Sequence, residues 1–347
     1  MSESQVRLDD RKAAILRAVV SHYVRSGEPV GSKTVVERFP VKVSPATVRN
    51  EMAALESAGF IFQPHTSAGR IPTDAGYRYF VDEWTARTRL SATETRRIKN
   101  FFVDATWELE ESLRRTASLL SGLTHHAAVV FAPSLDRSVV RHMELVGLEG
   151  DRAMLVLVTN TGRVENHVVI VPETLDDVQL EQAAEMLNRI VVGEPLESAA
   201  ATIIASLERF PLELRDSVTR VARVVSAEMT RDEGDRVFLE GTSNIVDEQK
   251  FADLETVRQV ISALEHRRIL LELAADALAL DRVSIRIGHE NTIEGMQSCT
   301  VITTAYGTEG FALGSLGIVG PTRMDYGRTI AAVNEVAAHL GRMLGGP

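Results

Sequence analysis

The sequence predicts an α+β chain, with a winged helix-turn-helix at the N-terminus followed by an α/β domain with an antiparallel sheet. Three observations support this prediction. Residues 8–88 form short helical segments punctuated by Gly and Pro, and a hairpin pattern follows the third segment. Short β-rich runs broken by turns fill 127–171, and strands resume over 283–319, where Val283, Ile285 and Ile287 alternate with polar residues. Helical periodicity prevails between these two regions, so we expect one combined sheet interrupted by a helical insertion.

Composition excludes several classes of protein. The chain has 347 residues, 44% of them hydrophobic and 25% charged, as is ordinary for a globular protein. It lacks the ~18-residue apolar run of a membrane span and the opening of a secretory signal. Its single cysteine, Cys299, cannot form an internal disulfide or a cysteine-cluster metal site. We therefore expect a cytoplasmic protein without a metal or cofactor.

Charge is unevenly distributed along the chain. Residues 1–90 hold 13 basic and 10 acidic side chains, a net charge of +3, whereas the remainder carries −13. Phosphate would repel the acidic part. Any nucleic acid is therefore expected to bind the N-terminal quarter.

Three helices are predicted in this quarter. The first runs from about Asp9 to Arg25 and ends before Gly27-Glu28-Pro29. The second begins at Ser32 as its cap. The third has Ser44 at the N-cap, Pro45 at the first helical position and Gly59 just past its end.

The third helix has the pattern of a DNA-reading helix. Val48, Met52 and Leu55 form its apolar stripe, and small or hydrogen-bonding residues lie opposite. Asn pairs with adenine, Ala and Thr methyl groups contact thymine, and Arg reaches guanine or phosphate. The structural alternative is a plain core helix with a solvated outer face.

A hairpin directly after this helix favours DNA binding. Phe60–Gln63 and Ile71 are predicted to be its strands, which makes it a wing whose tip places His65 and Arg70 along the DNA backbone or minor groove. The candidate DNA-binding residues are Ser44, Ala46, Thr47, Arg49, Asn50, His65, Thr66 and Arg70.

The remaining elements follow from periodicity. A long helix opens with the capping box Ser91/Glu94, and a strand meander with tight turns covers 127–171. Helices are expected around 180–191, 214–229, 254–264 and 330–344, and a small hairpin or loop around 234–246. The helix of 214–229 fits either an internal core or a subunit interface, and we favour the interface, with Leu214, Val218, Val221 and Val225 as candidate residues.

Six motifs resemble the heat-inducible transcription repressor HrcA family. They span Tyr23–Ser32, Ser44–Gly59, Thr66–Asp82, Phe238–Ile245, Ile287–Asn291 and Gly317–Tyr326. The resemblance implies a winged-helix domain (1–88), a GAF-like domain in two halves (89–194 and 251–347) and an inserted dimerisation domain (195–250). It also implies a dimeric repressor of chaperone operons that binds the inverted-repeat operator CIRCE, with the GroE chaperonin as a partner.

Two other functions remain open. The first is a ligand-sensing transcriptional regulator whose GAF-like domain binds a metabolite, with Gly317–Met324 shaping the pocket. The second is an enzyme, which the lack of a nucleophile, acid–base or phosphate-loop motif counts against. We expect no enzymatic activity.

Overall fold

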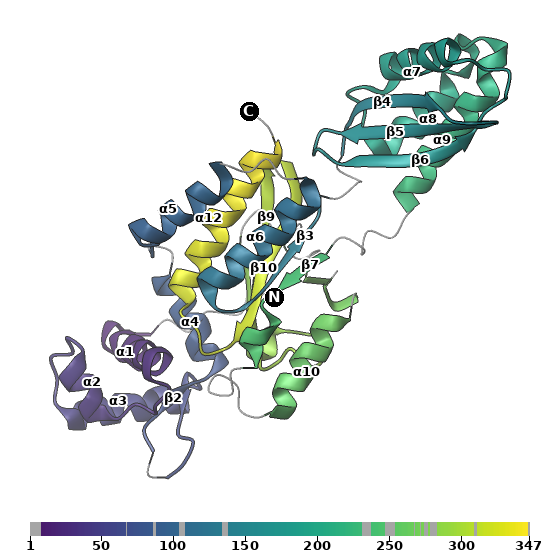
Figure 1. Cartoon of the computed structure of the whole chain (residues 1–347). Coiled ribbons are helices and arrows are strands. Elements are labelled where there is room, and N and C mark those ends of the chain that lie inside the picture. Colours follow the sequence, from purple (N-terminus) through teal and green to yellow (C-terminus); the bar gives the residue numbers. More distant parts are fainter. Residues whose placement is uncertain are drawn as a thin grey trace.

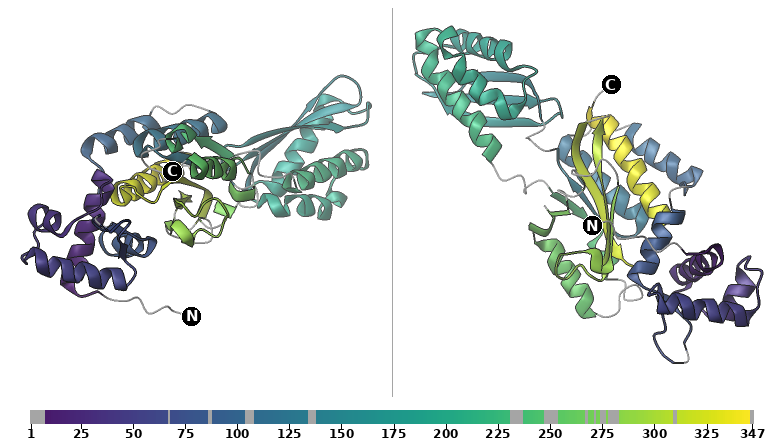
Figure 2. Two further views of the ribbon diagram at one scale, coloured as in Figure 1. Left: turned by 90° about the horizontal axis from the view of Figure 1, so that it is seen from below. Right: turned by 180° about the vertical axis from the view of Figure 1, so that it is seen from behind.

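The structure, a computed structural model, describes residues 8–66, 68–85, 88–103, 108–133, 138–230, 237–246, 254–266, 268–270, 272–273, 277, 283–308 and 311–345. Three parts form an elongated molecule (Figure 1). A small N-terminal module lies at one end and a five-stranded sheet with its helices lies in the middle. A second module, residues 138–230, lies at the opposite end, and both views in Figure 2 show the same order.

The N-terminal module has three helices, a two-stranded antiparallel hairpin and a fourth helix. These elements are α1 (Asp10–Ser26), α2 (Ser32–Arg38), α3 (Pro45–Ser57), β1 (Ile61–Phe62), β2 (Ile71–Pro72) and α4 (Asp74–Trp84). The first three helices and the hairpin lie where the sequence predicts them, with one difference, whereas α4 is not among the predicted helices. Ser32 is the first residue of α2 rather than its cap, because Gly31 holds the extended cap conformation.

The middle part is a sheet with the antiparallel strand order β7-β3-β10-β9-β8. Its strands are β3 (Ala127–Phe131), β7 (Val237–Glu240), β8 (Ser284–Ile287), β9 (Cys299–Thr308) and β10 (Phe311–Pro321). Helices α5 (Ala92–Val103), α6 (Leu109–Thr124) and α12 (Tyr326–Gly345) cover one face, and α10 (Leu254–Glu265) packs on the other. All five residues of β3 are buried because both faces are covered.

The 138–230 module has its own sheet. Strands β4 (Val140–Gly147), β5 (Arg152–Thr159) and β6 (Val164–Ile170) form an antiparallel meander. Helices α7 (Asp177–Val191), α8 (Leu196–Ala205) and α9 (Leu212–Thr230) cover one face.

The prediction of one combined sheet is therefore wrong. Only β3, of the strands in 127–171, pairs with the strands of 283–319. A single hydrophobic core also joins β4–β6 to α7–α9, so the expected boundary between 194 and 195 divides that core. The expected boundary between 250 and 251 lies outside the described residues.

The four proposed interface residues on α9 are also reassigned. Leu214, Val218, Val221 and Val225 are at most 2% exposed and belong to the core of the 138–230 module. Periodicity finds the apolar stripe of a helix but not what covers it. The interpretation of these four as a subunit interface is wrong, because the chain's own sheet and helices already cover them.

Two further elements differ from expectation. The helix starting at residue 91 is described as two helices, α5 and α6, although its capping box is confirmed by the hydrogen bonds between Ser91 and Glu94. Residues 237–240 are an edge strand of the core sheet rather than a local hairpin. Each helix in the described part is too short or too polar to cross a bilayer.

Candidate nucleic-acid interface

Local capping defines both ends of α3. The Ser44 hydroxyl accepts the Thr47 N–H at 3.1 Å, and Pro45 occupies the first turn. At the other end, the N–H groups of Gly59 and Phe60 donate to the carbonyls of Glu56 and Leu55. This is a Schellman closure with Gly59 in the left-handed region, at φ +81°. Both ends are as the sequence predicts.

The predicted side chains share the outer face of α3. Val48, Met52 and Leu55 are buried against the module's core, whereas Ala46, Arg49 and Asn50 are exposed. Thr47 is half-buried, and its hydroxyl lies 2.9 Å from that of Ser44. The structure therefore brings these side chains together at the N-terminal half of one helix, the part that contacts bases in helix-turn-helix proteins.

The two carboxylates of α3 are neutralised within the module. Glu51 lies 3.3 Å from the Lys12 ammonium and 3.6 Å from the Arg11 guanidinium, both on α1. Glu56 accepts two bonds from Arg70, at 3.0 Å from Nε and 2.9 Å from the terminal nitrogen. Neither carboxylate is left uncompensated, so α3 can approach phosphate.

Arg70 lies at the base of the hairpin and not at its tip. Its backbone exchanges two hydrogen bonds of 2.9 Å with Val30, which adds a third segment to the hairpin. Gly69 is needed there because a Cβ would lie 2.5 Å from the Val30 backbone. His65 and Thr66 remain exposed near the turn. The structure thus separates a positioning residue, Arg70, from two tip residues.

Sequence reasoning missed the ion-pair partners of this surface. Glu51 and Glu56 are ordinary charged residues of an amphipathic helix, and Glu56 lies 14 positions from its partner Arg70. One signal was available, since Gly69-Arg70 within the Thr66–Asp82 motif marks a close backbone approach.

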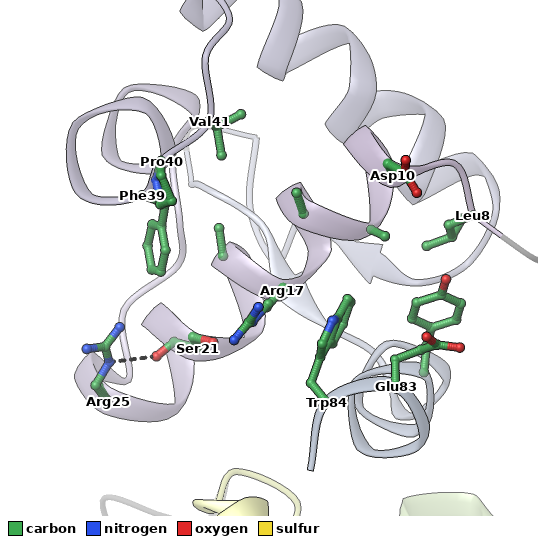
Figure 3. Close-up of a pocket in the computed structure, with 14 residues that line it drawn as sticks. Leu8, Asp10, Arg17, Ser21, Arg25, Phe39, Pro40, Val41, Glu83 and Trp84 are labelled. Atoms are coloured by element: carbon green, nitrogen blue, oxygen red, sulfur yellow. Dashed lines mark hydrogen bonds between the residues drawn. The ribbon is translucent and has the colours of Figure 1, made fainter. Parts of the chain in front are cut away.

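A cavity of about 660 Å³ lies elsewhere on the module (Figure 3). Its walls come from α1, the segment after α2 and the end of α4, and no residue of α3 lines it. Arg17 lies 5.8 Å from the Trp84 ring centre, and the Arg25 Nε donates to the Ser21 carbonyl at 3.0 Å. Asp10 and Glu83 line the same cavity as the two arginines, so the lining does not favour a ligand of either charge.

Comparisons with known proteins cover nearly the whole chain. Residues 110–330 match the family described as "HrcA protein C terminal domain". The chain is 43% identical over 339 residues to the heat-inducible transcription repressor HrcA of Acidothermus cellulolyticus, covering 97% of this chain and 99% of that relative. It is 45% identical over 340 residues to the HrcA of Thermobifida fusca, covering 98% of each.

One solved structure shares the fold. A crystal structure described as a hypothetical protein matches with a TM-score of 0.66 at 23% identity, covering 98% of this chain and 99% of that one. At this identity the likeness concerns the fold alone.

The relatives and the small N-terminal module define a class, the transcription repressors, which act by binding DNA. They are regulators rather than enzymes. The chain belongs to the HrcA family of heat-inducible transcription repressors.

Proposed function

We propose that the N-terminal module is a winged helix-turn-helix that reads operator DNA with α3 in the major groove. One observation carries this proposal: the outer face of α3 exposes small and hydrogen-bonding side chains, while both of its carboxylates are ion-paired. Asn50 bonds an adenine edge and Arg49 reaches guanine or phosphate. Ala46 and Thr47 contact thymine methyl groups, and the N-terminus capped by Ser44 faces a phosphate.

The hairpin is the wing in this proposal. His65 and Thr66 contact the DNA backbone or minor groove from its turn. Arg70 acts indirectly, because its guanidinium is bound to Glu56 and its backbone to Val30. It holds the wing against the reading helix.

The operator is proposed to be an inverted repeat of the CIRCE type, bound by a homodimer. The outer face of the β4–β5–β6 sheet is the surface that supports dimerisation. Five of the thirteen exposed large hydrophobic residues described lie on it or at its margin: Val146, Leu148, Val164, Val168 and Ile170. Strand register places Val146 beside Met154 and Met154 beside Val168, and Val158 beside Val164. Val156 lies between these two groups along β5 and connects them. A contiguous apolar surface of this kind is typical of an interface, and we assign it to a second copy of the chain.

Two further features come from family membership. The five-stranded part is proposed to be a GAF-like domain. The inserted dimerisation domain is proposed to be residues 138–230, which share one core, rather than 195–250. The GroE chaperonin is proposed as the partner that keeps the repressor active. Adding purified GroE to an operator titration tests this partner, and an operator affinity unaffected by GroE would contradict it.

Sequencing the genomic fragments retained by the purified chain tests the proposed function. We expect fragments that carry an inverted repeat upstream of chaperone operons. Arg49→Ala should abolish the enrichment, whereas Arg189→Ala, at an exposed arginine of α7, should not. Enrichment without a shared repeat, or equal enrichment by both variants, would contradict the proposal.

A further inference from the structure

Three motifs far apart in the sequence meet where the N-terminal module joins the sheet domain. They supply the start of α4, the 3-10 turn Gly288–Glu290 after β8, and the segment before α12. Figure 1 shows α4 at the side of the module that adjoins the sheet domain. None of these segments belongs to the outer face of α3, so DNA contact does not account for their residues.

A bidentate ion pair forms the first connection. The Nε of Arg78 donates to Glu290 Oε1 at 2.8 Å, and a second guanidinium nitrogen donates to Glu290 Oε2. The same guanidinium also reaches the Ile285 carbonyl. Glu290 is held in turn by the Ile287 N–H at 2.8 Å. A two-point bond between a planar fork and a carboxylate fixes orientation as well as distance.

Asp74 forms the second connection at the first residue of α4. Its Oδ2 accepts the backbone N–H of His289 at 2.9 Å and lies 2.8 Å from the His289 ring Nδ1. Gly288 makes this approach possible. Its φ is +55°, and a Cβ there would lie 2.1 Å from Asp74 Oδ2.

Aromatic contacts complete the junction on another side. The rings of Tyr77 and Tyr326 are 5.6 Å apart, and the Arg323 guanidinium lies 6.0 Å from the Tyr23 ring centre. A cavity of about 610 Å³ separates parts of the two surfaces. One hydrophobic core runs from the N-terminal module into the sheet domain, and the polar pairs beside it add directional contacts that set the angle between the module and the sheet.

This angle is transmitted directly to the reading helix. The Thr73 hydroxyl accepts the Gly76 N–H at the start of α4 and donates to the Gly59 carbonyl at 2.6 Å, just past the end of α3. Thr73 therefore ties α4, which carries Asp74 and Arg78, to the end of α3.

We propose that Asp74, Arg78, Gly288, His289 and Glu290, here called the junction cluster, determine the half-site spacing that the repressor accepts. This inference rests on the proposed function, a dimer that reads two half-sites. In each chain, the 138–230 module and the reading helix α3 lie at opposite ends (Figure 2). In a dimer joined through the 138–230 modules, the distance between the two α3 helices therefore depends on the angle at each junction. A rigid angle lets the second half-site bind intramolecularly at one spacing only.

The test titrates the full chain against a single half-site and against full sites whose spacing is shortened or lengthened by one or two base pairs. The wild type should bind one spacing best. Glu290→Ala and Gly288→Ala should lower affinity at that spacing by about tenfold, a fraction of the ~10²–10⁴ avidity available from linkage. Both should flatten the dependence on spacing and leave half-site affinity unchanged. Glu185→Ala, which breaks an exposed ion pair on α7, serves as the matched control.

Each outcome has one meaning. A wild type that binds no DNA sequence preferentially, or binds half and full sites equally, contradicts the proposed function and the inference with it. A wild type with a spacing optimum that both variants retain overturns the inference alone. Loss of half-site affinity in both variants also overturns it, because the cluster would then support the fold of the module and not its angle.

Discussion

The Arg70 guanidinium binds the Glu56 carboxylate at 2.9 Å, joining the hairpin to α3. Both side chains are partly exposed, at 21% and 32%. In the protein without DNA, a partly exposed ion pair of this kind contributes little to the free energy of unfolding. In the proposed complex with DNA the pair has a second effect, because a lone Glu56 carboxylate would repel an approaching phosphate.

Arg70→Ala should therefore weaken binding to operator and scrambled duplexes alike. Adding Glu56→Gln to this variant should restore part of the affinity, since the uncompensated charge is then gone. A double-mutant cycle on both duplexes measures the coupling between the two residues. If the double variant binds as weakly as Arg70→Ala, Arg70 contacts DNA itself.

Asn50→Ala should lower specific operator binding by ~1–3 kcal/mol and leave binding to a scrambled duplex nearly unchanged, because a bidentate bond to adenine is lost. Ser57→Ala, at the distant end of α3, is the control. Parallel titrations of both duplexes measure the effect. An equal loss of affinity for both duplexes would show that Asn50 contacts the DNA backbone or supports the fold of the module.

Val168→Asp should convert the proposed dimer into a monomer, because it buries a charge in the proposed interface. Val178→Asp is the matched control, since both valines are 59% exposed but Val178 lies on α7. Light scattering reports the mass, and operator titration should show full-site affinity falling towards half-site affinity. A dimeric Val168→Asp variant would exclude this sheet face as the interface.

Loss of the hydroxyl should affect the free energy of unfolding differently at two buried tyrosines. Tyr306 donates to the Phe131 carbonyl at 2.6 Å, so Tyr306→Phe should reduce the free energy of unfolding by about 1–2 kcal/mol. The Tyr77 hydroxyl is buried without a hydrogen-bond partner among the described residues. Tyr77→Phe should therefore be neutral or stabilising. Denaturant unfolding compares the two, and a larger loss for Tyr77→Phe would reveal a partner of its hydroxyl.

Stability should depend on Glu94 at acidic pH. Hydrogen bonds from Ser91, followed by the bond from Arg328, lower the pKa of Glu94 to about 2 from an ordinary 4.5. Because the folded state favours the carboxylate, this stabilisation is complete above pH 4.5 and is lost as the pH falls towards 2. Unfolding midpoints of wild type and Glu94→Gln should converge over that range. A constant difference between them would contradict the assignment.

Local chemistry made much of the N-terminal module predictable. Ser44, Pro45 and Gly59 define the ends of α3 through hydrogen bonds and backbone angles within a few residues of each terminus. The alternating strand of residues 152–159 and its glycine turns likewise predict the β4–β6 meander. In these segments the decisive contacts are close in sequence, so periodicity and capping rules detect them.

Only the tertiary structure decided which surfaces meet. The stripe of Val218 and Val221 would look the same against a second subunit or against the chain's own sheet, and β3 and β4 follow one another along the chain although the two join different sheets. Arg78 and Glu290 are 212 positions apart, and nothing local to either residue identifies its partner. Strand partners and ion pairs of this kind depend on contacts between distant segments, and these form only when the whole chain has folded.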